Sequence, residues 1–224
     1  MGGDGPVGPA RVPPAGPSAG VVAIVLAAGE GRRLGGPKAL LPLPRAAGAA
    51  PDGGPVLLDY VLGELLAAGI GQVVVVAGAR AAEVLARCQQ KGVYGVTNPD
   101  WRAGKATSIR TGVVAARKLV GRPAWFFIQG VDQPVGRVAL ESMLLATQEK
   151  DCPVLVPVYQ GRRGHPLVVG GVLAEALMTL DEDAGGLRSL RDRHHACPVP
   201  VEDPSVLFDL NRPEDLALLA TLVP

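Results

Sequence analysis

The stretch VLAAGEGRRLGGPKALL, Val25 to Leu41, determines how the rest of the chain is interpreted. A short aliphatic run, Val21 to Leu26, leads into it and opens directly onto glycines. A buried parallel strand delivers a loop to the carboxyl edge of its sheet in this way, and ligands of α/β proteins bind at that edge. The stretch therefore predicts a ligand-binding loop, and its glycines favour a phosphate ligand.

This loop satisfies neither of two common phosphate-binding patterns. A P-loop requires GxxxxGK followed by Ser or Thr, and the glycine spacing fits from Gly31 to Gly36, but Pro37 stands where the lysine belongs. A dinucleotide fingerprint requires GxGxxG, which Gly29 and Gly31 begin before Leu34 replaces the third glycine. The loop is expected to bind phosphate by a different arrangement.

Two cations of the loop fit a triphosphate. Arg33 and Lys38 can neutralise phosphate charge from opposite sides, while backbone amides freed by glycines near a helix start bind the oxygens. Pro37 fixes the backbone just before Lys38 and so presents the lysine stiffly. The alternative is a glycine-rich turn with two solvated cations.

Composition limits the classes of protein. Of the 224 residues, 48% are hydrophobic but only 4% are aromatic, so the core must consist of Ala, Val and Leu, as in layered α/β proteins. A formal charge of +1 gives no electrostatic argument for nucleic acid or a membrane surface as a partner. No apolar run approaches the ~20 residues that span a bilayer. We expect a cytoplasmic protein without nucleic-acid or membrane partners.

The cysteines predict no covalent or metal framework. Cys88, Cys152 and Cys197 are far apart and lack CxxC spacing, which suggests neither a zinc site nor a disulfide. They are expected to be the reduced thiols of a cytosolic protein.

Residues 1–19 are rich in Gly and Pro and predict a disordered leader, and residues 20–224 predict one domain. Pro44 to Pro55 is an equally turn-rich excursion, expected to be a surface loop that covers or flanks the site. The sequence leaves open whether this loop is an ordered lid.

The rest of the chain alternates strand and helix patterns, which predicts a three-layer, Rossmann-like α/β fold with a mostly parallel sheet. CPVLVPVYQG and GHPLVVG predict an antiparallel hairpin around Gly161 to Gly164. Helices are expected near Gly136 to Lys150, Gly171 to Leu180 and Gly185 to Arg193, and a last one from Pro213.

Two aspartates follow apolar residues at positions expected to lie at one sheet edge. Asp132 ends the strand pattern PAWFFIQGVDQP, and Asp209 lies in LFDLN before the last helix. Two hard oxygen donors brought together there would hold Mg²⁺ between phosphate oxygens. The alternative for each aspartate alone is a turn or helix-capping role.

A glycine loop, two cations and a metal clamp suit phosphoryl or nucleotidyl transfer, which depends mainly on positioning and charge neutralisation. If the nucleophile is itself a phosphate, no general base is needed, which fits a chain with three histidines. His194 and His195 are expected at a solvated helix end. His165, in the turn GRRGHP, is a candidate site residue, with a plain hairpin role as the alternative.

LAAGEGRRLGGPK resembles the signature of the MobA-like nucleotidyltransferases, and the chain is most similar to their molybdenum cofactor cytidylyltransferase branch. The resemblance runs from about Val21 to the C-terminus and rests on further motifs in the expected order. These motifs are NPDWRAGKATSIRTG, VDQP, GRRGHP, DEDAGGLRSL and DLNRPEDL.

The resemblance implies roles for individual residues. The nucleotide would contact Leu26, Ala27, Ala28, Gly29, Gly31, Gly78 and Ser108. Its phosphates would be held by Arg33 and Lys38, which with Asp132 form the implied catalytic set. Mg²⁺ would be bound by Asp132 and Asp209. The pterin substrate would be faced by Gln133, Arg163, Gly164 and His165.

The implied reaction is attack by the terminal phosphate of molybdopterin on the α-phosphorus of a nucleoside triphosphate, with release of pyrophosphate. The guanylyl branch reads LAGG where this chain has Ala28, so CTP is favoured over GTP. A recipient molybdoenzyme or its chaperone would take the product. The sequence leaves three alternatives open: transfer from GTP, a related transferase acting on a sugar phosphate or other phosphorylated metabolite, and a non-catalytic cofactor carrier.

Three departures from the family pattern affect these expectations. Leu34 replaces a methionine of similar volume, which should be harmless. Lys105 and Ala106 replace a methionine and a small residue after Gly104, in a loop expected to approach substrate. The turn DEDAGGLRSL has its arginine, Arg188, displaced by one position, and we carry no role over to it.

Overall fold

The sheet has its strands in the order β3-β2-β1-β4-β7-β5-β6, with β8 paired to β5. The computed structural model describes residues 20–43, 54–212 and 214–215. The expected leader, most of the Pro44 to Pro55 loop and the helix expected from Pro213 lie outside these residues. The strands are β1 (Val21–Ala27), β2 (Val73–Ala77), β3 (Tyr94–Thr97), β4 (Trp125–Gly130), β5 (Val154–Tyr159), β6 (Arg162–Arg163), β7 (Leu167–Gly170) and β8 (Cys197–Pro200).

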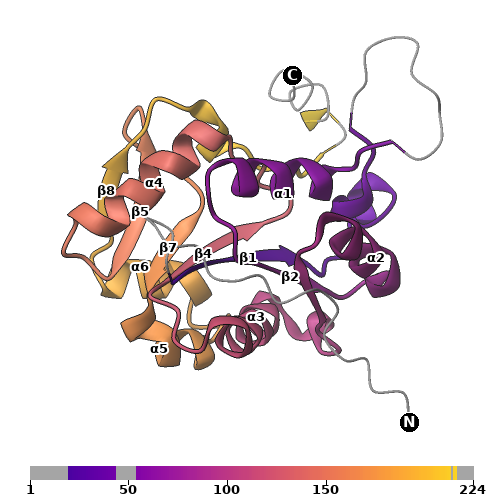
Figure 1. Cartoon of the computed structure of the whole chain (residues 1–224), viewed down its shortest axis with the longest axis horizontal. Helices are drawn as coiled ribbons and strands as arrows, with labels where there is room; N and C mark the ends of the chain where they lie inside the picture. Colours follow the sequence, from indigo (N-terminus) through magenta and orange to yellow (C-terminus); the bar gives the residue numbers. More distant parts are fainter. Residues whose placement is uncertain (1–19, 44–53, 213, 216–224) are drawn as a thin grey trace.

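Helices cover both faces of this sheet, which gives the three layers expected from the sequence (Figure 1). The α-helices are α1 (Leu57–Ala67), α2 (Ala81–Lys91), α3 (Lys105–Val120), α4 (Arg137–Glu149), α5 (Ala174–Met178) and α6 (Gly186–Arg193). Short 3-10 turns are η1 (Arg32–Leu34), η2 (Lys38–Leu40), η3 (Trp101–Ala103), η4 (Gly171–Leu173) and η5 (Pro204–Leu207).

Strand β1 is buried along its whole length and divides the core in two. Its alternate side chains, such as Val25 and Ile24, point to opposite faces because a strand has a two-residue repeat. One face packs against α1, α2 and α4, and the other packs against α3, α5 and α6. Gly112 lets α3 approach closely, since a Cβ there would lie 2.4 Å from the Cγ2 of Ile24.

The antiparallel element expected from the sequence is confirmed. Strand β7 runs against both β4 and β5, and β6 pairs with β5 at the tip of the hairpin. All other strand pairs are parallel. The hairpin carries the GRRGHP turn back toward the carboxyl end of β4, where Asp132 follows.

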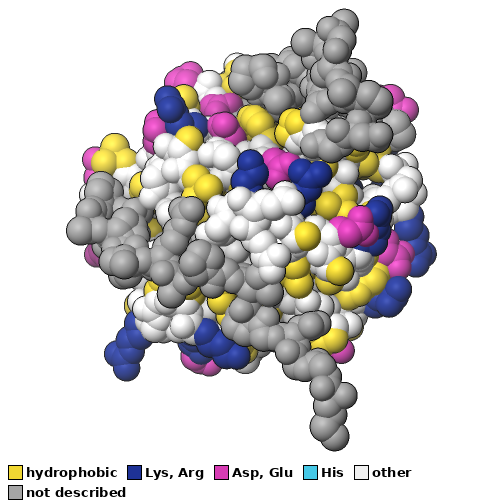
Figure 2. All heavy atoms as spheres, turned by 45° about the vertical axis from the view of Figure 1, so that its right-hand side comes forward, with side chains coloured by type: hydrophobic (Ala, Val, Ile, Leu, Met, Phe, Trp, Pro, Cys, Tyr) yellow, Lys and Arg dark blue, Asp and Glu magenta, His cyan; other side chains and the backbone are white. Residues whose placement is uncertain are grey.

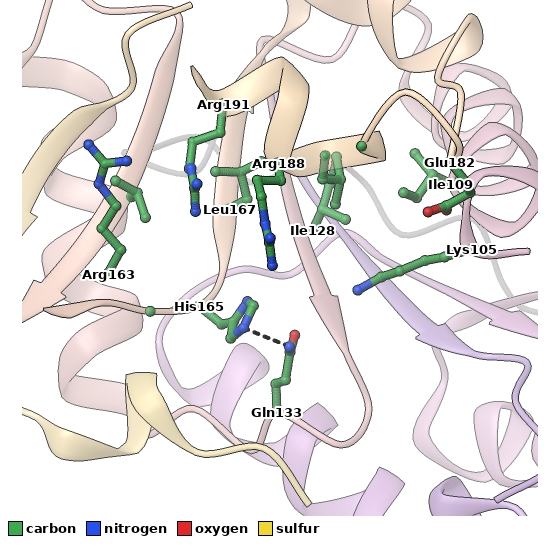
Figure 3. A pocket seen from close by; sticks show the side chains of 14 residues that line it. Lys105, Ile109, Ile128, Gln133, Arg163, His165, Leu167, Glu182, Arg188 and Arg191 are labelled. Atoms are coloured by element: carbon green, nitrogen blue, oxygen red, sulfur yellow. Dashed lines mark hydrogen bonds between the residues drawn. The ribbon is translucent and has the colours of Figure 1, made fainter. Parts of the chain in front are cut away.

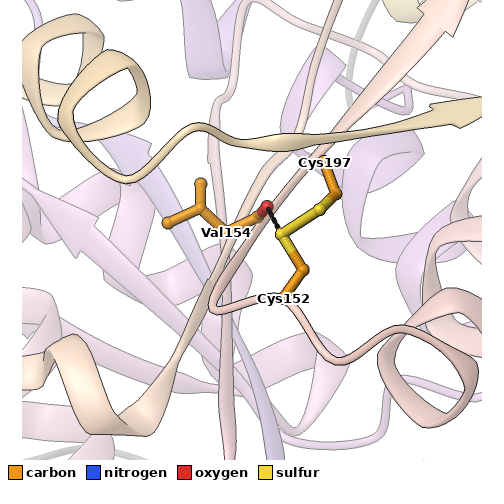
Figure 4. Close-up of a disulfide and its surroundings, with 3 residues drawn as sticks. All are labelled: Cys152, Val154 and Cys197. Atoms are coloured by element: carbon orange, nitrogen blue, oxygen red, sulfur yellow. Dashed lines mark hydrogen bonds between the residues drawn. A yellow bond between two sulfur atoms is a disulfide. The ribbon is translucent and has the colours of Figure 1, made fainter.

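The prediction that all three cysteines are reduced thiols is wrong for two of them. Cys152 and Cys197 form a disulfide between the segment before β5 and the first residue of β8 (Figure 4). The two strands are parallel neighbours, with Cys197 opposite Leu155, so residues 45 apart in sequence meet at one end of the sheet. Cys88 is a free, buried thiol whose pKa burial raises to about 12.

The described surface mixes both signs of charge. On the face turned forward in Figure 2, basic and acidic side chains lie beside one another rather than in a patch of one sign. No helix among the described residues is long and apolar enough to cross a membrane.

We expect the disulfide to stabilise the fold by about 4 kcal/mol, because a cross-link over 45 residues lowers the entropy of the unfolded chain. Urea unfolding of the wild type should shift to a lower midpoint in dithiothreitol. The variant C152S/C197S should show that lower midpoint with or without reductant. A wild-type midpoint that does not respond to dithiothreitol would contradict the cross-link.

Candidate functional site

The glycine loop closes on itself after β1. Gly31 has a φ of 63°, and its carbonyl oxygen accepts hydrogen bonds from the amides of Leu34 at 2.9 Å and Gly36 at 3.3 Å. A Cβ at Gly31 would lie 1.8 Å from the Gly36 carbonyl oxygen, so only glycine fits there. Pro37 then precedes Lys38, the first residue of η2, as the sequence indicated.

Lys38 and Asp132 form the central contact of the site. The Lys38 Nζ donates to Asp132 Oδ2 at 2.8 Å and to Asn211 Oδ1 at 3.0 Å. The side chains of Lys38 and Asp132 are 21% and 29% exposed, so a ligand can still reach both. This contact joins the loop after β1, the turn after β4 and the C-terminal segment.

The turn after β4 brings the second aspartate close. The amide of Leu210 donates to the carbonyl oxygen of Asp132 at 2.9 Å, which places Asp209 beside that turn. Gln133 accepts from the Gly130 amide through Oε1 at 2.8 Å, and its Nε2 donates to Asp209 Oδ1 at 2.8 Å. A Cβ at Gly130 would lie 2.1 Å from Asp132 Oδ1, so a side chain there would displace the Asp132 carboxylate.

His165 joins the same cluster from the hairpin. Its backbone amide donates to the carbonyl oxygen of Val206, and its Nε2 lies 2.8 Å from Gln133 Nε2, which donates to it. Burial lowers the pKa of His165, although the nearby Asp209 carboxylate opposes that shift. A neutral ring that accepts at Nε2 agrees with this direction. Gly164 is required beside it, because a Cβ would lie 2.3 Å from the Val206 carbonyl oxygen.

Three small cavities surround the glycine loop, with shared lining residues. One, of about 160 Å³, is lined by Leu26, Ala27, Gly29, Gly31, Lys38, Ala39, Val131 and Asp132. The second, of about 210 Å³, is lined by Gly31, Arg32, Arg33, Leu34, Lys38 and Asn211. The third, of about 260 Å³, is lined by Leu26, Ala28, Gly29, Trp101, Gly104, Lys105, Ser108, Gly130 and Asp132. The residues predicted around a nucleotide therefore lie together, apart from Gly78.

Gly78 lies behind the third cavity. A Cβ on Gly78 would stand 2.6 Å from the Trp101 ring and 2.8 Å from the Ala28 Cβ. Glycine at this position therefore lets Trp101 and Ala28, which line the third cavity, pack against the backbone. Ser108 is buried, lines the third cavity and accepts a hydrogen bond from Asn98 Nδ2 at 3.0 Å, which fixes the position of its side-chain oxygen.

An ion-pair bridge ties the Trp101 segment to the glycine loop. Glu30 pairs with Arg32 and, at 3.3 Å, with Arg102, and the hydrogen bond from Arg32 lowers the pKa of Glu30. The Arg102 guanidinium lies over the Trp101 ring, 4.3 Å from its centroid. Sequence analysis did not assign roles to Trp101, Arg102 or Asn211. Asn211 could have been found from its place two residues after Asp209.

A larger cavity, of about 430 Å³, adjoins the third small one, and Lys105 lines both. Its wall includes the four residues that sequence analysis assigned to the acceptor: Gln133, Arg163, Gly164 and His165. It also includes Arg188 and Arg191 of α6, which sequence analysis did not assign. The sequence of α6 does not show which cavity the helix faces, because that depends on how the helix packs against the rest of the fold.

The donor set fits a divalent cation. Asp132 and Asp209 supply hard carboxylate oxygens, and Asp132 Oδ1 has no hydrogen bond among the described residues. That part of the chain contains no group of three His, Cys, Asp or Glu side chains that could hold a metal. An ion at this pair would take its other ligands from phosphate and water, as Mg²⁺ commonly does.

A glycine loop at the carboxyl edge of a doubly wound sheet, beside the ion pair of Lys38 and Asp132, is an arrangement that suits a nucleotidyltransferase. The chain belongs to the family of MobA-like NTP transferase domains, which it matches over residues 23–197.

The chain is also similar to individual proteins and solved structures. The chain is 33% identical over 186 residues to nicotine blue oxidoreductase of Paenarthrobacter nicotinovorans, covering 77% of this chain and 82% of that protein. It superposes with Rv0371c from Mycobacterium tuberculosis at a TM-score of 0.70 and 25% identity, covering 90% and 98% of the two chains. A further structure of Rv0371C is a complex with manganese, at 24% identity and a TM-score of 0.67 with coverage of 91% and 99%.

A third similar structure is molybdopterin-guanine dinucleotide biosynthesis protein A from Archaeoglobus fulgidus. Its TM-score is 0.59 at 20% identity, with coverage of 90% of this chain and 97% of that one. At this identity the likeness concerns the fold.

Lys38→Met should weaken binding of a magnesium nucleoside triphosphate by about tenfold, because it removes a charge-assisted contact to phosphate. Lys118→Met is the control, since Lys118 lies on α3 beside a separate cavity. Titration calorimetry with Mg-CTP measures both dissociation constants. Equal affinity of Lys38→Met and wild type would contradict a phosphate role for Lys38.

Proposed function

We propose that this protein is a molybdenum cofactor cytidylyltransferase. An oxygen of molybdopterin's terminal phosphate attacks the α-phosphorus of CTP, a new P–O bond forms, and the bond to the β-phosphate breaks as pyrophosphate leaves. The observation that carries this proposal is the row of adjoining cavities. The glycine loop lies at one end, and the 430 Å³ cavity with His165, which we call the acceptor cavity, lies at the other; Asp132 lies between them.

The loop side of the row suits the triphosphate. Arg33 is exposed, has no ion-pair partner among the described residues, and lines the cavity that Lys38 shares. In the proposal both cations neutralise the β- and γ-phosphates, which stabilises the departing pyrophosphate. Leu26, Ala27, Gly29 and Gly31 form the surface against which the phosphates rest.

Asp132 and Asp209 hold Mg²⁺ in this proposal. The bound ion would neutralise charge that develops on the phosphate oxygens. The known complex of Rv0371C with manganese supports a divalent ion in this family. Gln133 positions Asp209 by its hydrogen bond, and Lys38 orients Asp132.

No general base is needed, because the attacking phosphate is already ionised at neutral pH. His165 serves the acceptor in its neutral form: it holds Gln133 and lines the acceptor cavity beside Gly164 and Arg163. The fixed geometry of both substrates then supplies most of the rate acceleration.

In this proposal the third small cavity binds the base of the nucleotide and so distinguishes CTP from GTP. Ala28, Trp101 and Ser108 line it, and Gly78 packs behind Trp101 and Ala28. The methyl group of Ala28 narrows the space that a purine would need. This supports CTP over GTP as the donor.

A second candidate is an oxidoreductase activity, because the relative with 33% identity is named nicotine blue oxidoreductase. The loop favours the transferase, because Leu34 stands in place of the third glycine of the GxGxxG pattern that binds the dinucleotide cofactors of many oxidoreductases. Release of pyrophosphate separates the two candidates, because an oxidoreductase reaction produces none.

Magnesium CTP should raise the melting temperature more than magnesium GTP. A ligand at a hundredfold excess over its dissociation constant adds about 2.7 kcal/mol to the free energy of unfolding. Ala28→Gly should narrow the difference between the two nucleotides. Equal shifts with every triphosphate in the wild type would remove the base preference from the proposal.

Asp132→Asn should lower pyrophosphate release by at least about a hundredfold while the melting temperature stays within a few degrees of wild type. The neutral amide keeps the shape but not the charge needed by the metal and by Lys38. Asp151→Asn, at an exposed position, is the matched control and should keep full turnover. Unchanged turnover in Asp132→Asn would refute its catalytic role.

A further inference from the structure

The acceptor cavity is strongly basic over an apolar floor. Four cationic side chains line it, those of Lys105, Arg163, Arg188 and Arg191, against one carboxylate, that of Glu182. The floor consists of the aliphatic residues Ile109, Ile128, Val156, Leu167 and Leu187. Such a cavity suits a ligand with an apolar or flat body and more than one negative charge.

Two of the four cations already have a protein partner. Asp192 accepts from Arg191 Nε at 2.8 Å and lies 3.5 Å from Arg163 Nη1. Figure 3 shows that the Arg163 guanidinium points away from the pair formed by His165 and Gln133. Arg163 and Arg191 are therefore partly neutralised by the protein itself.

The other two cations, Lys105 and Arg188, have no ion-pair partner within the described part of the chain. Glu182 does not neutralise Lys105: it forms no ion pair with it, and its carboxylate lies beside Gly186 at the start of α6. In Figure 3 both Lys105 and Arg188 extend into the cavity toward His165 and Gln133. An unpaired cation in a lined cavity is the group that a ligand anion stabilises most.

The two unpaired cations come from different elements. Lys105, the first residue of α3, also lines the nucleotide cavity with Ala28, Ser108 and Asp132. Arg188 lies on α6 and lines the acceptor cavity but none of the three cavities around the glycine loop. Lys105 is thus at the border between the two cavities, and Arg188 lies on the acceptor side of that border.

We propose that the acceptor carries two anionic groups, which bind at Lys105 and at Arg188. Lys105 binds the phosphate that attacks the nucleotide, and Arg188, supported by Arg191, binds a second anion across the apolar floor. Which anion binds at which cation rests on the proposed function, because that function places the attacking phosphate next to the nucleotide cavity, where Lys105 lies. Lys105 is then a catalytic residue and Arg188 determines acceptor specificity.

The test uses two aromatic probes with the full-length protein and no nucleotide: phenyl phosphate and 4-carboxyphenyl phosphate. Titration calorimetry should show that the wild type binds the second compound about tenfold more tightly, from one added charge-assisted contact. Arg188→Ala should remove this preference. Lys105→Met should weaken the binding of both compounds by the same factor, and the control Lys118→Met should bind both compounds as the wild type does.

The two proposals can fail separately, because the binding test contains no nucleotide. A protein that does not use CTP could still prefer 4-carboxyphenyl phosphate, and a protein that binds both probes equally could still use CTP. The proposal is overturned if the wild type binds both probes equally, or neither, or if Lys105→Met and Arg188→Ala match Lys118→Met. Loss of the preference in Lys105→Met instead of Arg188→Ala overturns the order of the two groups.

Discussion

The site depends on the parallel pairing of β1 with β4, in which Leu26 lies opposite Gly130. Parallel neighbours end at the same edge of a sheet, so the glycine loop after β1 and the Asp132 turn after β4 must emerge side by side. The Val131 amide donates to the carbonyl oxygen of Leu26 at 3.0 Å and extends that register beyond the strands. The ion pair of Lys38 with Asp132 is possible only because of this register.

The reversed strand β7 completes the arrangement. It pairs with β4 directly after the GRRGHP turn, which brings His165 to Gln133. The segment after η5 then contacts the Asp132 turn through the hydrogen bond from the Leu210 amide to the Asp132 carbonyl oxygen. Four segments distant in sequence thus supply polar side chains to one edge of the sheet. In the proposed reaction these side chains position the substrates and neutralise phosphate charge, which agrees with a site that combines cations, carboxylates and a neutral histidine.

Local patterns of sequence were sufficient for much of this structure. The run before Gly29, the alternation of strands and helices, and the hairpin around Gly161 were all predictable because each depends on neighbours in the chain. The disulfide was not, because Cys152 and Cys197 meet only through the parallel pairing of β5 with β8. Arg188 and Arg191 were missed for the same reason: the packing of α6, and not its sequence, decides that they line the proposed acceptor cavity.

The most direct test of the account is the identity of the product. Purified protein is supplied with molybdopterin, Mg²⁺ and each nucleoside triphosphate in turn, and the pterin species are identified by mass. The account predicts a cytosine dinucleotide of molybdopterin with one pyrophosphate released per product, formed with CTP in preference to GTP. Unmodified molybdopterin with every triphosphate, in a sample that binds Mg-CTP, would contradict it.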